Sequence, residues 1–224
     1  MQSMLAQKEM KKQAEKLERS ALEKYGEMKN RKARPPLEQL VMSIFCRRTS
    51  VGQATRALRE LKRGFVDWNE VRVSHPAELA SGLPATQWAR VGAEQLVWLL
   101  RDLYERYSSI DLDFLAELTA AQARSCLQSL PAVQRDMADE VLLLSLDVSV
   151  LPLTPAAARM CYRLGLLEND RPTLKNQRSL SKLLDPECYA SLHLFFCDYA
   201  DRLCLTEEPL CADCPLTDHC AATG

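Results

Sequence analysis

The chain ends in a cysteine-rich stretch that reads Cys204-Leu-Thr-Glu-Glu-Pro-Leu-Cys211-Ala-Asp-Cys214-Pro-Leu-Thr-Asp-His-Cys220. Six, two and five residues separate successive cysteines, so the intervening loops are short enough for four thiolates to reach one metal centre. Structural zinc usually takes its ligands as two close pairs, and only Cys211 and Cys214 form such a pair here. A cubane iron–sulfur cluster, in which each cysteine holds one iron, suits this uneven spacing better.

This spacing, Cys-x6-Cys-x2-Cys-x5-Cys, resembles the C-terminal cluster loop of the endonuclease III and MutY branch of the helix-hairpin-helix DNA glycosylases. The resemblance implies a 4Fe–4S cluster, with bound zinc or a disulfide pair as the alternatives. Its expected ligands are Cys204, Cys211, Cys214 and Cys220. The other cysteines stand in apolar surroundings and are expected to be small buried hydrophobic residues: Cys46, Cys126, Cys161, Cys188 and Cys197.

The bulk composition is that of an ordinary globular protein with one sizeable core or two small lobes. The chain has 224 residues, of which 47% are hydrophobic and 26% are charged. No apolar run approaches 18 residues, and the N-terminus is charged from Lys8 onward, so we expect neither a membrane span nor export. Because a cysteine-rich chain that is not exported indicates a reducing compartment, we expect a cytoplasmic protein at the bacterial nucleoid or its equivalent.

The charge is distributed unevenly along the chain. The net charge is −1, but residues 1–36 carry ten basic and five acidic side chains, which leaves 19 basic and 25 acidic side chains in the remainder. A protein that binds duplex DNA neutralises phosphates with Lys and Arg. We therefore expect the folded body to bind DNA only weakly.

Helical periodicity and only seven glycines predict an all-α fold. Helices are expected over residues 4–32, 36–45, 51–62, 76–83, 86–106, 110–118, 120–127, 141–146 and 155–164. The helix at 76–83 should begin at Ser74, and Pro35 and Pro36 should end the element before it.

The first expected helix is strongly charged and has a narrow apolar stripe that predicts packing on the body. The stripe consists of Met10, Ala14, Leu17, Ala21 and Met28. The alternative is a basic arm that contacts DNA or a protein partner, with Arg31, Lys32 and Arg34 nearest the body.

The stretch Ser129-Leu-Pro-Ala-Val-Gln-Arg-Asp-Met-Ala138 resembles the hairpin consensus Leu-Pro-Gly-Val-Gly-Arg-Lys-Thr-Ala of the same family, and the match continues without a gap to Leu166. The resemblance covers about residues 36–220 and implies a two-lobed helix-hairpin-helix DNA glycosylase fold with a C-terminal cluster loop. The expected parts are an N-terminal charged helix packing on the cluster lobe (1–37), a helical lobe ending in the hairpin (38–148) and the cluster lobe (149–224).

Two glycines of the family hairpin are replaced in this chain. In the family, the hairpin binds a DNA phosphate through backbone N–H groups at a helix N-terminus, helped by a cation, and the glycines allow the positive φ that this needs. Ala132 and Gln134 stand at these positions. Because a non-Gly residue at positive φ costs roughly 1 kcal/mol, we expect the hairpin to keep its fold and to hold phosphate less well.

The catalytic positions of the family are also changed. Bifunctional members hold a lyase lysine where this chain has Asp136, and an aspartate cannot form a Schiff base. Other members keep an aspartate at the position of Thr154, whose hydroxyl we expect to cap a helix that Gly165 ends. A neutral hydroxyl cannot offset a cationic transition state as a carboxylate does. We therefore predict no catalytic residue. The alternative is an active glycosylase of base-excision repair with a displaced carboxylate, for which Asp147 is a poor candidate.

Two further departures concern surface charge. Arg47 and Arg48 stand where a family glutamine inserts into the gap left by the extruded base, and they are either a wedge or a plain surface pair. Acidic residues surround the tail cysteines, with Arg202 opposing them: Asp201, Glu207, Glu208, Asp213 and Asp218. In DNA-binding members of the family this loop is commonly basic, so the change from a basic to an acidic surface favours a structural role for the cluster. The sequence thus predicts an iron–sulfur protein that is catalytically degenerate and binds DNA weakly, or binds a protein partner.

Overall fold

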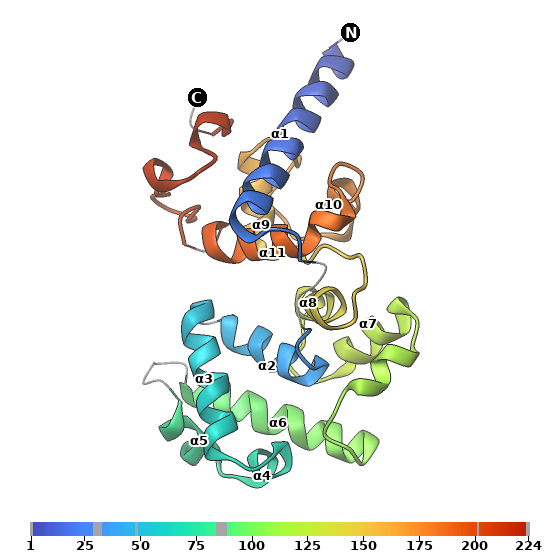
Figure 1. The fold of residues 1–224 in the computed structure, drawn as a ribbon, viewed down its shortest axis with the longest axis vertical. Helices are drawn as coiled ribbons and strands as arrows, with labels where there is room; N and C mark the ends of the chain where they lie inside the picture. Colours follow the sequence, from blue (N-terminus) through green and yellow to red (C-terminus); the bar gives the residue numbers. More distant parts are fainter. Residues whose placement is uncertain (1, 29–32, 48, 84–88, 201, 223–224) are drawn as a thin grey trace. The chain divides into compact units, whose positions relative to one another are not determined.

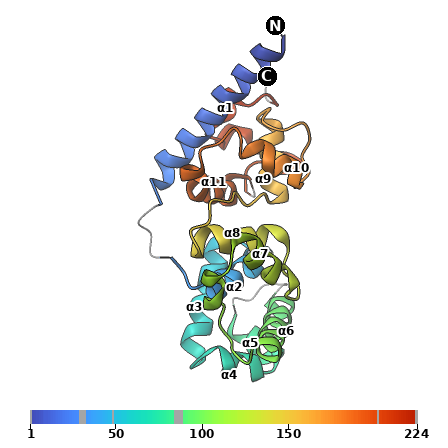
Figure 2. The ribbon, with the colours of Figure 1, turned by 90° about the vertical axis from the view of Figure 1, so that its right-hand side faces the viewer.

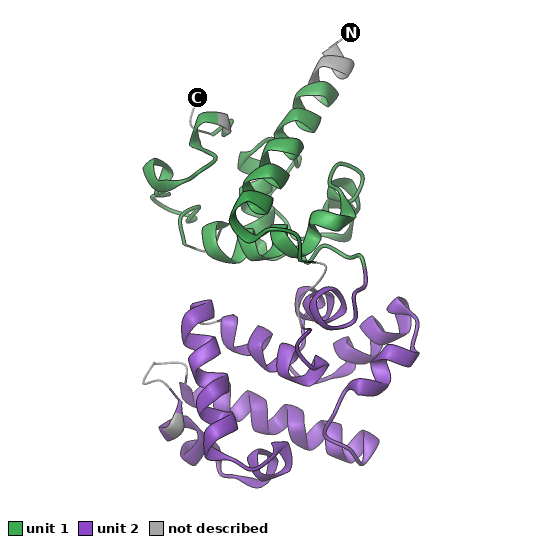
Figure 3. Ribbon diagram, in the orientation of Figure 1, with its two compact units in different colours: residues 1–32, 149–224 green, residues 33–148 purple. Residues whose placement is uncertain are grey.

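The computed structural model describes residues 2–28, 33–47, 49–83, 89–200 and 202–222, and all regular structure within these ranges is helical (Figure 1). This is the all-α class that the periodicity predicted. The chain divides into two compact units, one of residues 1–32 with 149–224 and the other of residues 33–148 (Figure 3). No helix among the described residues is both long and apolar enough to cross a membrane.

The unit of residues 33–148 is built around α2, whose apolar side chains are buried on nearly every side. Its helices are α2 (Pro36–Cys46), α3 (Val51–Gly64), α4 (Trp68–Val73), α5 (Pro76–Gly82), α6 (Ala89–Tyr107), α7 (Ala120–Ser129) and α8 (Arg135–Ser145). Helix α2 packs against α3, α6 and α8, so that Leu40, Val41 and Phe45 are fully buried. A helix with neighbours on three sides must be apolar all round.

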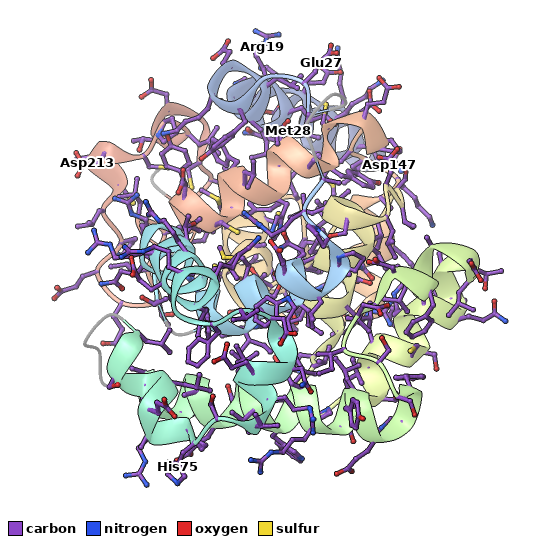
Figure 4. All side chains as sticks on the ribbon, turned by 60° about the horizontal axis from the view of Figure 1, so that its bottom comes forward. Arg19, Glu27, Met28, His75, Asp147 and Asp213 are labelled. Atoms are coloured by element: carbon purple, nitrogen blue, oxygen red, sulfur yellow. The ribbon has the colours of Figure 1, made fainter. Side chains whose placement is uncertain are left out.

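Four details of this unit differ from the prediction, and one of them is that α8 begins at Arg135 and not at residue 141. Helix α4 was not predicted, because only Val71 of its six residues is buried. Its start is fixed by a cap, in which the side chain of Asp67 accepts the N–H of Glu70 at 2.9 Å. The cap of α5 is the ring Nδ1 of His75 (Figure 4), which accepts the N–H of Ala77 at 3.2 Å, and not Ser74. In place of a helix over 110–118 there is a short 3-10 turn, Asp113–Glu117.

The second unit combines the N-terminal helix with the C-terminal third of the chain. It contains α1 (Gln2–Tyr25), α9 (Pro155–Arg163), α10 (Leu174–Leu180) and α11 (Tyr189–Phe195). A 3-10 turn (Pro186–Cys188) precedes α11, and a π-helical turn (Phe196–Ala200) and 3-10 turns at Cys211–Asp213 and Thr217–His219 follow it. Helix α1 packs on α11 with Ala14, Leu17 and Ala21 fully buried. Its N-terminal half extends beyond α9 and α11 (Figures 1 and 2).

Helix α1 ends earlier than predicted. Gly26 adopts φ +66 and donates its N–H to the carbonyl of Leu22 at 2.7 Å, which terminates the helix seven residues before the predicted end. Met28 therefore lies beyond the helix (Figure 4). Pro36 is the first residue of α2 and does not end the preceding element. Arg31 and Lys32 lie outside the described residues, whereas Arg34 donates to Oε1 of Gln39 at 2.8 Å.

Candidate cluster site and hairpin

The four tail cysteines line one cavity in the unit that carries the C-terminus. The cavity measures about 230 Å³. Its wall also includes apolar side chains from α9 and the loop: Met160, Leu164, Leu203, Pro209 and Leu216. All nine cysteines of the chain lie among the described residues, and none of them forms a disulfide there. The disulfide alternative is therefore not what the structure holds, and the four tail sulfurs lie around one space.

Helix α9 fastens the cysteine loop through two arginines. Arg163 donates from Nη1 to the sulfur of Cys204 at 3.3 Å and to the carbonyl of Leu205 at 2.6 Å, and from Nη2 to the carbonyl of Thr206 at 3.1 Å. Arg159 donates from Nε to the carbonyl of Cys204 at 2.8 Å. A loop with little regular structure of its own gains order from these charge-assisted bonds.

The thiols of Cys214 and Cys161, both in this unit, have raised pKa values. Burial raises the pKa of Cys214, and the neighbouring Cys204, Cys220 and Cys211 raise it further. Burial, with Cys204 nearby, also raises the pKa of Cys161, which lies on α9 and is fully buried. Both thiols therefore favour the protonated form, and a bound cation would favour the thiolate form.

The sulfurs of the four tail cysteines line a common cavity of about 230 Å³. Within the described ranges, no three His, Cys, Asp or Glu side chains are arranged to hold a metal ion. Four cysteine sulfurs spaced around a common volume are the donor set that a polynuclear iron–sulfur group requires.

The outside of the loop is acidic. Glu207, Glu208, Asp213 and Asp218 are exposed, and Asp213 points outward from its turn (Figure 4). Arg202 is exposed as well, whereas Asp201 lies outside the described residues. The surface that surrounds the cysteines therefore attracts cations and repels phosphate.

The second predicted site, the hairpin, is a tight turn between α7 and α8. A capping box of Thr119 and Gln122 starts α7, and the N–H of Val133 donates to the carbonyl of Leu130 at 3.3 Å across the turn. Ala132 has φ +61, as predicted for the first glycine position. Gln134 has φ −89, so the expectation of a positive φ there was wrong. It is the residue before α8, where extended backbone starts a helix without strain.

Asp136 lies in the first turn of α8 and is only 8% exposed. Its carboxylate forms an ion pair with Arg47 at the C-terminus of α2, and its Oδ1 also accepts the N–H of Met137 at 3.1 Å. Arg47 is thus held by a buried carboxylate, a contact that neither interpretation of the arginine pair included. Arg48 lies outside the described residues.

Two more buried acids on α8 were missed by sequence reasoning. Asp139 is fully buried. Its carboxylate forms ion pairs with Nε of Arg124 at 2.5 Å and with Nε of Arg135 at 3.8 Å. Glu140 accepts a hydrogen bond from Ser43 on α2. The signal was present in the sequence, because positions 136, 139 and 140 share one face of a helix.

The pKa of Glu140 is raised to about 7, chiefly because its carboxyl is buried. The hydrogen bond from Ser43 lowers the pKa, the charge of Asp136 raises it, and the charge of Arg47 lowers it. The carboxyl is therefore a proton-binding group near neutral pH.

The remaining predicted positions behave as capping residues. Oγ1 of Thr154 accepts the N–H of Ala157 at 3.1 Å, Pro155 is the first helical residue, and Gly165 follows the end of α9 with φ +75. The predicted cap and stop are confirmed. Asp147 follows the end of α8, is exposed and has φ +53 (Figure 4). It belongs to the unit of residues 33–148, whereas Thr154 belongs to the other unit.

No family model matches the sequence. Sequence relatives include endonuclease III of Thermotoga maritima, 26% identical over 86% of this chain and 85% of that protein, and thymine/uracil-DNA glycosylase of Pyrobaculum aerophilum, 26% identical over 84% and 81%. Similar solved structures include endonuclease III in a non-covalent complex with DNA (TM-score 0.72, 19% identity, 95% and 96% of the two chains) and a thermostable thymine-DNA glycosylase (TM-score 0.70, 16% identity, 95% and 97%).

The fold and the hairpin define the class of protein, an all-α protein with the helix-hairpin-helix architecture of these structures. The resemblance to the helix-hairpin-helix DNA glycosylase superfamily, and within it to the endonuclease III type, is supported by sequence relatives and solved structures that align with most of this chain.

Proposed function

We propose that this protein binds DNA as an endonuclease III-type iron–sulfur protein and carries out neither the strand-cleaving lyase step nor aspartate-assisted base removal. The repair glycosylases among its relatives support the DNA-binding part of this proposal. The lost chemistry follows from the residues at two catalytic positions, Asp136 and Thr154.

The ion pair between Asp136 and Arg47 carries the proposal. Schiff-base formation needs an amine that can lose its proton and attack the sugar C1′. The position that holds this amine in bifunctional relatives holds a buried carboxylate, and the nearby cation is a guanidinium, which remains protonated. Neither group can act as the nucleophile, so the lyase route is closed.

Thr154 supports the same conclusion for base removal. Its hydroxyl is engaged as the cap of α9 and carries no charge. A developing cationic sugar is stabilised by a fixed negative charge in a dry site, which threonine does not supply.

The cluster is proposed to be 4Fe–4S, with Cys204, Cys211, Cys214 and Cys220 as ligands. These side chains line one cavity, and Arg163 binds the loop at Cys204. When bound, the group supplies a cross-link among four loop positions, so its role is structural.

DNA binding is proposed to be weak and to take place in the cytoplasm at the nucleoid. Ala132 and Asp136 alter the hairpin that holds phosphate in the family, and the acidic loop surface disfavours a polyanion. Basic residues of α1 would then contribute contacts. The acidic loop is also suited to a basic protein partner.

The test is a single-turnover assay on duplexes that carry an abasic site, damaged bases or mismatches, with borohydride trapping of any imine. We expect neither base release nor a trapped adduct, whereas endonuclease III of Thermotoga maritima serves as the positive control. A trapped adduct with this protein would contradict the proposal.

A second candidate function is base removal by a displaced carboxylate. The observation that favours it is Glu140, a buried carboxyl that is neighbour to Asp136 and holds a proton near neutral pH. Base release that is abolished by Glu140→Gln and retained in Asp147→Asn would establish this function. Release abolished only by Asp147→Asn would assign the role to the exposed aspartate instead.

A further inference from the structure

Helix α3 has two chemically opposite faces. Its buried face consists of small and branched apolar side chains: Ala54, Ala57, Leu58 and Leu61. The side chains of Arg56, Arg59 and Arg63 are all exposed. At 3.6 residues per turn, these arginines fall within an arc of about 60° that lies opposite the buried face. The three guanidinium groups therefore form one basic stripe that points into solvent.

The charges of this stripe are largely uncompensated. Helix α3 has four basic residues and one acidic residue in a region of the chain that is acidic overall. Arg63 lies 3.4 Å from Glu60 and Lys62 lies 2.7 Å from Glu38. For Arg56 and Arg59, the described part of the chain offers no ion-pair partner. Neighbouring guanidinium groups with few counter-charges repel one another, and a bound polyanion would relieve this repulsion.

The stripe begins beside the hairpin helix within the same unit. Arg47, which contacts Asp136 in the first turn of α8, lies three residues before Ser50, and Ser50 caps α3 by accepting the N–H of Gln53. Helix α3 also packs on α2 along its buried face. The N-terminus of α3 is thus close to the start of α8, and the basic stripe runs onward from there.

We propose that the outward face of α3 binds the phosphate backbone of a DNA duplex through Arg56, Arg59 and Arg63. This inference rests on the proposed DNA binding and names a surface for it outside the hairpin. The three arginines span about 10 Å along the helix, a length that corresponds to about three phosphates of one strand. Arginine holds phosphate in a bidentate manner, and a rigid helix presents its side chains with little loss of backbone entropy.

The face is suited to a nucleic acid and not to a protein. Protein interfaces bury a core of apolar or aromatic side chains. On α3 the only exposed large apolar residue is Val51, at the first position. The stripe offers charge without an apolar anchor, which is the composition of a backbone-contacting surface.

The experiment measures binding of the full-length protein to a fluorescent 20-base-pair duplex as a function of KCl concentration. In Arg56→Ala/Arg59→Ala we expect the slope of log affinity against log salt to fall by about 1.8, since each lost phosphate contact removes about 0.9. Arg171→Ala/Arg178→Ala is the matched control, because both of its arginines are exposed and lie in the other unit. This control should keep the wild-type slope. The charge-preserving Arg56→Lys/Arg59→Lys should also keep most of it.

The outcomes separate this inference from the proposed function. Wild-type protein that does not bind the duplex at low salt would refute DNA binding itself. Wild-type binding with an unchanged slope in Arg56→Ala/Arg59→Ala would refute only the role of α3. Equal losses in both double alanine variants would reduce the effect to net charge and overturn the inference. Tighter binding of an RNA duplex with the same dependence on Arg56 and Arg59 would replace DNA as the occupant. Melting curves verify that all variants are folded.

Discussion

Arg47 and Asp136 form an ion pair between the C-terminus of α2 and the first turn of α8, beside the hairpin. Asp136 is 8% exposed, and the ion pair offsets part of the cost of burying its carboxylate. The pair joins two helices of the unit. Two of the positions that depart from the family, Arg47 and Asp136, therefore compensate each other's charge in the fold.

Breaking the pair should destabilise the unit of residues 33–148. We expect Arg47→Ala to lower the free energy of unfolding by roughly 1–3 kcal/mol, because a buried carboxylate loses its counter-charge. The double variant Arg47→Ala/Asp136→Ala should cost less than the sum of the two single changes. Urea unfolding of the four proteins of this double-mutant cycle gives the coupling energy. Additive costs would show that the pair contributes nothing.

The stability of the protein should depend on pH through Glu140. Its pKa is raised from 4.5 to about 7 in the folded state. The folded protein therefore binds a proton that the unfolded chain releases, and stability decreases as the pH rises from about 4.5 to about 7. The total loss of folding free energy is roughly 3 kcal/mol, because each unit of pKa shift corresponds to about 1.36 kcal/mol. Glu140→Gln should remove this slope, as seen in melting temperatures between pH 5 and pH 8. A variant with the wild-type slope would assign the dependence to other groups.

Loss of one tail cysteine should remove the cluster and loosen the loop. Protein purified with iron supplied should be brown, whereas Cys211→Ser should contain little iron and expose the loop to proteases. Cys126→Ser is the control, since this cysteine lies in the other unit. Iron analysis and limited proteolysis report on both variants. A colourless protein that contains zinc would contradict the iron–sulfur assignment.

Arg163 should be required to hold the loop on α9. It donates to the sulfur of Cys204 and to the carbonyl groups of Leu205 and Thr206. Arg163→Ala leaves these acceptors without their donor, so we expect a loss of about 2 kcal/mol and faster release of iron to a chelator. Arg171→Ala, an exposed arginine of the same unit, is the control. Equal rates of iron release in the two variants would count against this role.

The N-terminal half of α1 can be tested separately from its packed half. Ala14, Leu17 and Ala21 are buried, so deletion of the whole helix would uncover α11. Lys8, Lys11 and Lys12 are exposed. Their replacement by Gln should leave the melting temperature unchanged and reduce the salt slope of DNA binding by up to about 2.7. An unchanged slope would indicate that this arm does not contact DNA.

Local signals in the sequence correctly predicted most helices and their caps. Thr154, Pro155 and Gly165 bracket α9 because cap chemistry and positive φ depend on neighbouring residues alone. The end of α1 was missed, because the pattern of apolar residues continued past Gly26 and the break at that glycine was overlooked. Helix α4 was missed for the opposite reason, since six residues with one buried side chain give almost no periodicity.

The sequence alone determined the class of fold, the spacing of the tail cysteines and the changed residue types in the hairpin, because each of these is a property of residues close together along the chain. Only the tertiary structure decided what those residue types contact. Arg47 meets Asp136 and Ser43 meets Glu140 across roughly ninety residues or more of chain. Such contacts arise when α2 packs on α8, and no local pattern can specify them. The same packing buries Glu140 and thereby sets the pKa of its carboxyl.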